Sequence, residues 1–135
     1  MADDVPPGFA LIETSAFIQH LGGLYRHPET GVFGMRTLPE HANAHLNVHG
    51  GFLATLVDVA VSRGTRLTLG DGSMVSTVTM TLNHLEPVPM GSWVEARPSL
   101  DRAGSRTVFT SCEVSVGELL VARATAVLAR HRPKS

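Results

Sequence analysis

One stretch of the sequence repeats its apolar residues at the spacing of a helix, and the chain after it repeats them at the spacing of a strand. From Gly51 to about Leu69, apolar residues recur every three or four positions and form a wide stripe, which predicts a long helix. The Gly-Asp-Gly sequence at 70–72 then ends it. From Met74 onward the period is two, as in strands. Such a chain has to pack its helix against a sheet.

Four strands are predicted after the helix and two short ones before it. The later strands cover Met74 to His84, Trp93 to Leu100, Ser105 to Val116 and Leu119 to Arg130, and the earlier ones cover 24–26 and 32–38 around a turn at 27–31. Residues 15–21 read as a short helix capped by Thr14 or Ser15. Because the later turns are brief, we expect an antiparallel meander. The predicted fold class is α+β, with a sheet of five or six strands wrapped around one helix, and the threonine-bearing outer face of the sheet suggests a dimer.

Size and charge exclude several kinds of function. The 135 residues are expected to form one domain, 1–135, with a flexible lead-in at 1–13 and a basic tail at 131–135. A formal net charge of −1 argues against nucleic-acid binding. Neither a signal peptide nor a membrane-spanning run is found, so we expect a soluble, cytoplasmic protein that binds no membrane. The single cysteine, Cys112, excludes an intrachain disulfide and reads as a buried structural thiol.

The start of the long helix has the features most suggestive of chemistry. Gly50 and Gly51 leave the N–H groups of the first turn accessible and allow a ligand to approach the backbone. These N–H groups and the positive end of the helix dipole suit a developing oxyanion. Asp58 follows two turns later, where a carboxylate in an apolar helix is costly unless it is hydrogen-bonded or lies at a solvated cleft. An ion pair of Asp58 with Arg63 or Arg66, or simple exposure, is the alternative interpretation.

This string of residues resembles the hotdog-fold acyl-CoA thioesterases, specifically the phenylacetate-degradation (PaaI-like) subfamily of the 4-hydroxybenzoyl-CoA thioesterase superfamily. The hallmark is an Asn, then His-Gly-Gly at the start of the central helix, then an Asp nine residues after the His. Here these are Asn43, His49, Gly50, Gly51 and Asp58, and the resemblance covers roughly residues 20 to 130. It implies a hydrolase that splits acyl-CoA thioesters into a free acid and CoA. It also implies a homodimer or homotetramer with active sites at the dimer interface.

The resemblance implies catalytic roles for four residues, and His49 is added to this candidate catalytic set as a member of the motif. The Gly50 N–H would bind the thioester carbonyl oxygen, and Asn43 would help to polarise or orient that carbonyl. Asp58 of the partner subunit would activate a water as general base or attack directly as nucleophile. Ser76 would hold the water or Asp58, and the alternation of its strand puts it on the inward face. His49 belongs to the motif and would shape the loop rather than act as the base.

Substrate contacts are expected at the helix and at one distant turn. Gly51 and Thr55 lie near Gly50 and Asp58 on the helix. For the CoA phosphates or pantetheine, the resemblance suggests the turn after the second later strand, with Arg102, Gly104, Ser105 and Arg106, although ordinary solvation of a turn is the alternative. Acyl selectivity would come from apolar residues such as Phe52, Leu53, Leu56, Val57, Val61 and Met80.

No cofactor is expected, because coenzyme A is part of the substrate, and no metal is expected either. His41, His45 and His49 are spaced by four and could imitate a metal-binding helix face, but the His-Glu-x-x-His motif is absent. The chain also has no Gly-x-Ser-x-Gly motif and no serine or cysteine set plainly beside a histidine.

Three other functions stay open. A hydratase or dehydratase on the same fold would need a His–Asp pair in its own motif, which is not found. An acyl-CoA-sensing module would keep the fold without turnover, but such regulators usually carry a DNA-binding segment, and the chain before Ser15 is short and acidic. A carrier-protein thioesterase could be distinguished only by assay.

Overall fold

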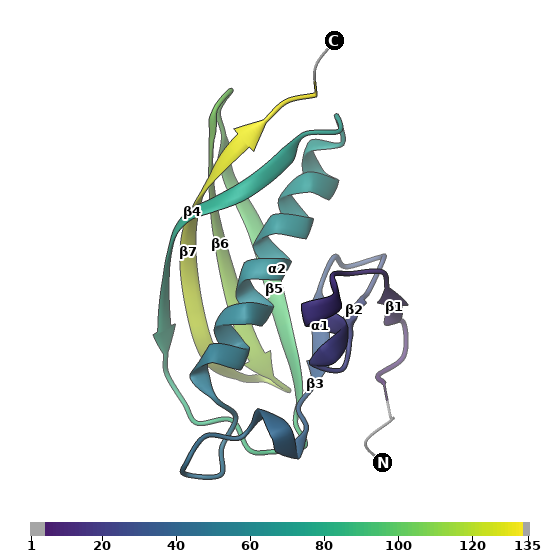
Figure 1. Cartoon of the computed structure of the whole chain (residues 1–135), viewed down its shortest axis with the longest axis vertical. Coiled ribbons are helices and arrows are strands. Elements are labelled where there is room, and N and C mark those ends of the chain that lie inside the picture. The colour runs from purple at the N-terminus through teal and green to yellow at the C-terminus, as the bar shows by residue number, and fades with distance from the viewer. Residues whose placement is uncertain (1–4, 134–135) are drawn as a thin grey trace.

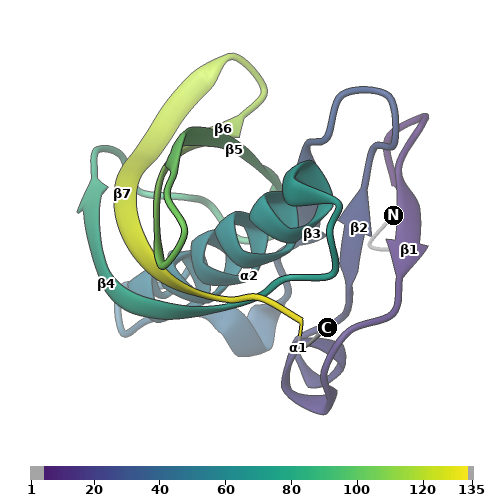
Figure 2. The same cartoon turned by 90° about the horizontal axis from the view of Figure 1, so that it is seen from above.

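Helix α2 (Gly50–Leu69) is the axis of the molecule, and a seven-stranded antiparallel sheet curls around it (Figure 1). The computed structural model describes residues 5–133. The helix has the predicted ends: His49 caps its first turn, and Gly70 closes it in the left-handed conformation at φ 62°. In Figure 2, strands β4 to β7 arch around α2, while β3, β2 and β1 continue the sheet away from it.

The sheet has the order β1-β2-β3-β5-β6-β7-β4, and all neighbours pair antiparallel. The α+β class and the wrapped helix are therefore confirmed, with seven strands instead of five or six. The strands are β1 (Ala10–Ile12), β2 (Leu24–Arg26), β3 (Phe33–Arg36), β4 (Met74–His84), β5 (Trp93–Ala103), β6 (Thr107–Val116) and β7 (Leu119–His131). A short helix α1 (Ala16–His20) and a 3₁₀ turn η1 (Pro39–His41) complete the elements.

The expected meander is correct for β5, β6 and β7 but wrong for β4, which pairs with β7 and not with β5. The physical reason is the length of the connections. The hairpins at 104–106 and 117–118 are too short for anything but neighbouring strands, whereas residues 85–92 cross from one side of α2 to the other (Figure 1). As a result β4 is an edge strand of the sheet.

One face of α2 is buried by the sheet and the opposite face is left open. Leu56, Val57, Ala60 and Val61 have no exposed surface and share one core with buried residues of β5, β6 and β7. On the other side of the helix, Asp58 is exposed, and Ala54, Thr55, Val59 and Ser62 around it are half-buried. The predicted apolar stripe is therefore the buried face of α2, and Asp58 lies outside this stripe, at the margin of the sheet.

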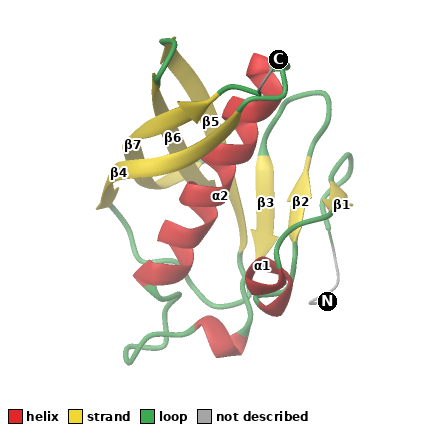
Figure 3. Cartoon of the chain, turned by 45° about the horizontal axis from the view of Figure 1, so that its top comes forward, coloured by secondary structure: helices red, strands yellow, loops and turns green. Residues whose placement is uncertain are grey.

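The N-terminal elements border this open face. Helix α1 confirms the predicted short helix, and its cap is Ser15, whose Oγ accepts the Ile18 N–H at 3.4 Å. It lies beside α2 and in front of β2 and β3 (Figure 3). The lead-in predicted at 1–13 includes β1, which pairs with β2, and the predicted basic tail includes His131 at the end of β7. Residues 1–4 and 134–135 of those two segments lie outside the described residues.

Within the part of the chain that the structure describes, no helix combines the length and the apolar character needed to cross a bilayer.

The buried Cys112 should be inert in the folded protein. Its side chain is 2% exposed, and burial raises the pKa of its thiol to about 12, so the reactive thiolate is absent at neutral pH. With a chromogenic disulfide reagent, we expect less than about 0.1 thiol per native chain and one per chain after unfolding in guanidinium chloride. Rapid stoichiometric labelling of the native protein would contradict this burial. The same result sets the background of any thiol-release assay.

Candidate active site

Asn43 organises the loop that leads into α2. Its side-chain Oδ1 accepts the N–H groups of His45 at 2.8 Å and Asn47 at 3.1 Å, and its own N–H donates to the Asn47 carbonyl at 2.7 Å. Leu46, at the loop tip, takes a positive φ of 64°. The Asn43 oxygen is thus held by the loop, as in an Asx turn, and the side-chain NH₂ makes no hydrogen bond within residues 5–133.

His49 closes the loop and caps the helix. Its Nδ1 accepts the Gly51 N–H at 2.8 Å, and its own N–H donates to the His41 carbonyl at 2.7 Å. The Gly51 N–H is therefore used by the cap, and the His49 ring is fixed with Nδ1 unprotonated. The Gly50 N–H has no acceptor among residues 5–133, so it is the amide at the positive end of α2 that can receive a ligand atom.

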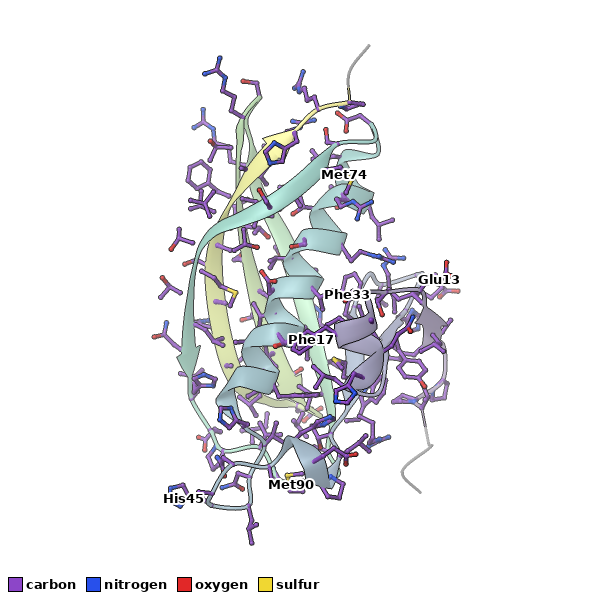
Figure 4. The ribbon with its side chains drawn as sticks, in the orientation of Figure 1. Glu13, Phe17, Phe33, His45, Met74 and Met90 are labelled. Atoms are coloured by element: carbon purple, nitrogen blue, oxygen red, sulfur yellow. The ribbon has the colours of Figure 1, made fainter. Side chains whose placement is uncertain are left out.

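Gly50 and Asn43 line the same cavity, of about 360 Å³. The loop and the helix start form one part of its wall, and the chain from His84 to Val88 forms the other part. The loop tip carries His45, which lies at the far end of the molecule from Met74 (Figure 4). We call this space the amide cavity. Two of its lining residues carry a hydrogen-bond donor, the backbone N–H of Gly50 and the side-chain NH₂ of Asn43, and an oxyanion needs such donors.

Asp58 lines a separate cavity of about 400 Å³ between α1 and α2. We call it the carboxylate cavity; its wall is formed by Ser15, Phe17, Ile18, Ala54, Thr55, Asp58, Val59 and Ser62. Phe17, 60% exposed, projects from α1 beside α2 (Figure 4). Thr55 thus lies with Asp58, while its Oγ1 donates to the Gly51 carbonyl at 2.9 Å.

The Asp58 carboxylate is held by a threonine and not by an arginine. Thr77 Oγ1 donates to Asp58 Oδ1 at 2.6 Å. The ion-pair alternative is not seen: Arg63 donates to the Glu13 carbonyl at 2.6 Å, and no ion pair involves Asp58 within residues 5–133. Asp58 therefore keeps one carboxylate oxygen directed by Thr77 and stays accessible from the carboxylate cavity.

Ser76 was expected beside Asp58, and that expectation is wrong because β4 contains a β-bulge. The register with β7 shifts between Thr77 and Thr79, so Val78 is the extra residue. A bulge restarts the alternation of side chains, and Thr77 rather than Ser76 faces α2 before it. Ser76 lies on the other face, where its Oγ is 3.0 Å from His131 Nε2.

The Ser76–His131 contact also corrects the expectation that no serine lies beside a histidine. Both residues are exposed, and neither lines the amide cavity or the carboxylate cavity. The pair is therefore a cross-strand contact between β4 and β7.

The residues expected to bind CoA are not near either cavity in the same chain. Arg102, Gly104, Ser105 and Arg106 lie at or next to the β5–β6 turn, which is at the C-terminal end of α2 (Figure 1). The turn begins later than predicted, because β5 ends at Ala103 and not at Leu100. Arg130 fixes it by donating its Nη1 to the Gly104 carbonyl at 3.0 Å.

The apolar residues expected to set acyl selectivity separate into two groups. Leu56, Val57 and Val61 belong to the fully buried core and reach no cavity described above, whereas Leu53 lines the amide cavity. Phe52 is also buried and stacks on His41, with ring centroids 4.3 Å apart.

The three histidines spaced by four have separate roles in the loop. His41 Nδ1 accepts the Leu38 N–H at 2.9 Å, and burial lowers the pKa of His41, which favours the neutral ring. His49 caps α2, and His45 lies at the loop tip. Among residues 5–133, no group of three His, Cys, Asp or Glu side chains is placed to hold a metal ion.

His84 is a site residue that the sequence analysis missed. It lines the amide cavity, and a methyl group added to Gly50 would lie 3.3 Å from its Nε2. Simple alternation already puts His84 on the same face as Met80 and Leu82. However, simple alternation places Ser76 on that face as well. It does not predict that the end of β4 lies beside the start of α2.

A curled antiparallel sheet around one long central helix is the hotdog fold, and the cavities beside Gly50 and Asp58 are its candidate site. The model of the thioesterase superfamily matches residues 45–127. The chain is 30% identical over 134 residues to the protein of Pseudomonas aeruginosa that is named "Putative esterase PA0474", covering 96% of this chain and 98% of the relative. The chain therefore belongs to the thioesterase superfamily, and its activity is thioester hydrolysis.

Two further relatives agree with this assignment. Acyl-coenzyme A thioesterase THEM4 of Bos taurus is 35% identical over 89 residues, which is 64% of this chain and 35% of the relative. The crystal structure of a phenylacetic acid degradation-related protein of Ralstonia eutropha superposes with a TM-score of 0.75 at 29% identity, covering 87% of this chain and 92% of that chain. The resemblance to the PaaI-like subfamily is thereby confirmed.

Replacing Thr77 and Ser76 in turn tests which of the two side chains supports Asp58. Thr77→Val removes the hydroxyl that directs Asp58, so we expect kcat to fall roughly tenfold with little change in KM, whereas Thr77→Ser keeps the donor and most of the activity. Ser76→Ala should leave kcat within about twofold of the original. Loss of activity in Ser76→Ala, together with full activity in Thr77→Val, would show that Ser76 faces Asp58 as simple alternation predicts. Steady-state kinetics on one thioester substrate is sufficient.

Proposed function

We propose that the chain hydrolyses acyl-CoA thioesters at a composite site, in which the amide cavity of one copy meets the carboxylate cavity of a second copy. The observation that carries this is the separation of the two groups. Gly50 and Asp58 lie eight residues apart on one helix, about 12 Å along its axis, and they line different cavities. A nucleophile has to come within about 3–3.5 Å of the carbon it attacks. One chain therefore does not bring its own Asp58 to a carbonyl bound at its own Gly50.

The edge strand β4 supports the assembly of two copies. It presents a free strand edge of eleven residues, and such an edge is a template for pairing with another chain. Met74 and Val78 on it are 51% and 65% exposed, so a partner would cover apolar surface. Because β4 also carries Thr77, its pairing would put the Asp58–Thr77 pair close to the interface.

The chemistry of a thioester suits these few groups. When the carbonyl is attacked, its oxygen gains negative charge, which the Gly50 N–H and the Asn43 amide would stabilise. Asp58 of the partner subunit would act as general base on a water or as nucleophile. The leaving group is a thiolate, whose conjugate thiol has a pKa near 8–9, so no strong general acid is required. A single directed carboxylate is then sufficient.

Coenzyme A is proposed as the thiol of the substrate and not as a cofactor. The support is the bovine relative, whose name is acyl-coenzyme A thioesterase. The arginine-bearing β5–β6 turn, with Arg102 and Arg106, is proposed to contact the phosphates of CoA; within one chain it is far from Gly50, so this contact also depends on a second copy.

Replacing Asp58 tests the proposed reaction. With a panel of short, aromatic and long acyl-CoAs, we expect thiol release by the original protein and a fall in kcat of at least about 100-fold in Asp58→Asn. The matched control is Asp101→Asn, an exposed carboxylate on β5 that accepts a hydrogen bond from Ser111 and lines neither cavity. It should keep full activity.

Three outcomes of this assay are informative. Equal activity in Asp58→Asn would refute the assigned role of this carboxylate. Tight acyl-CoA binding without turnover by the original protein would indicate a sensing module. Turnover of acyl carrier protein thioesters alone would indicate a different thiol. A single turnover in oxygen-18 water then separates base from nucleophile, because only nucleophilic attack puts label-free oxygen from Asp58 into the first product.

A further inference from the structure

His84 is a polar side chain fixed directly beside the amide that is proposed to bind the thioester oxygen. A methyl group on Gly50 would lie 3.3 Å from both Nε2 and Cε1 of His84 and 4.0 Å from Cδ2, so the Nε2–Cε1 edge of the ring faces the glycine. His84, Gly50 and Asn43 all line the amide cavity. The ring of His84 makes no hydrogen bond within residues 5–133, and its nitrogens are free for a ligand.

The backbone determines this position of His84. Because the bulge at Val78 restarts the alternation, Thr77 before it and Met80, Leu82 and His84 after it all face α2. His84 pairs with Ala122 as the last residue of β4. Just beyond it, the N–H groups of Leu85 and Glu86 both donate to the Val121 carbonyl, at 2.8 and 3.2 Å. The end of the strand is thus held on both sides of the histidine.

We propose that His84 is a further catalytic residue, whose Nε2–H donates a hydrogen bond to the thioester carbonyl oxygen held at the Gly50 N–H. This inference rests on the proposed function, because it needs a carbonyl in the amide cavity. A tetrahedral oxyanion accepts more than one hydrogen bond, and a second preorganised donor lowers the barrier of the attack step. Imidazole can donate from Nε2 in its neutral form and in its protonated form, so the role does not require a change of charge.

A space-filling wall is the competing explanation for the same geometry, and replacing the ring separates the two. Phenylalanine keeps a planar ring but has no donor, whereas glutamine loses the ring and places an N–H group near the position of Nε2. We expect His84→Phe to lower kcat at least about tenfold with KM changed less than about threefold, and His84→Gln to stay within about threefold of the original. A His84→Phe variant with full kcat would overturn the proposal. So would equal losses in both variants.

A matched control is available at the other end of the sheet. His131→Phe makes the same replacement on β7, outside both cavities, and should leave kcat unchanged. If His84→Phe does not fold, as judged by circular dichroism and thermal melting, His84→Ala takes its place. The proposal then requires a low kcat that added imidazole partly restores, and a full kcat without imidazole would overturn it.

The assays distinguish an error in the proposed function from an error in the role of His84. If the original protein releases no thiol from any acyl-CoA, the proposed function is wrong. If the original protein is active, Asp58→Asn is inactive and His84→Phe keeps full activity, only the role of His84 is wrong, and the ring is a wall of the cavity.

Discussion

The rigidity of α2 is the constraint on which the arrangement of the site depends. A helix fixes the distance between its residues, and Gly50 and Asp58 stand on two different cavities of the same helix. Folding of one chain can place each group accurately but cannot bring the two together. The sheet buries the apolar face of the helix and leaves the Asp58 face open, so a second copy has access to the carboxylate. Under the proposed function, stability and catalysis therefore depend on different faces of one helix.

Strand β4 connects the two parts of the site. Thr77 directs the Asp58 carboxylate near one end of the strand, and His84 stands against Gly50 at the other end. These residues are seven positions apart, an odd number, so in a regular strand they would face opposite sides of the sheet. The bulge at Val78 adds the residue that turns both toward α2. The bulge therefore lets a single edge strand contribute to both parts of the proposed site.

Periodicity predicted the elements well, and it failed where one extra residue changes the outcome. The helix and its glycine stop, the short helix capped by Ser15 and the late strands follow from apolar spacing and turn residues, which are local properties. The pairing of β4 with β7 and the bulge are set by tertiary packing, so alternation assigned the contact with Asp58 to Ser76 instead of Thr77. For the same reason His84 was not predicted to line a cavity, whereas the motif residues Asn43, Gly50 and Asp58 do line the two cavities.

Complementation between two inactive variants tests the composite site most directly. Gly50 is the first residue of α2, where proline is tolerated, so Gly50→Pro removes the N–H while keeping the helix start. Neither Gly50→Pro nor Asp58→Asn should be active alone. When both are co-expressed and mix at random, half of the dimers hold one intact pairing of Gly50 with the partner's Asp58, and about a quarter of the original activity should return. If mixed dimers form but show no activity above the two parents, each site is built from one chain and the account is wrong.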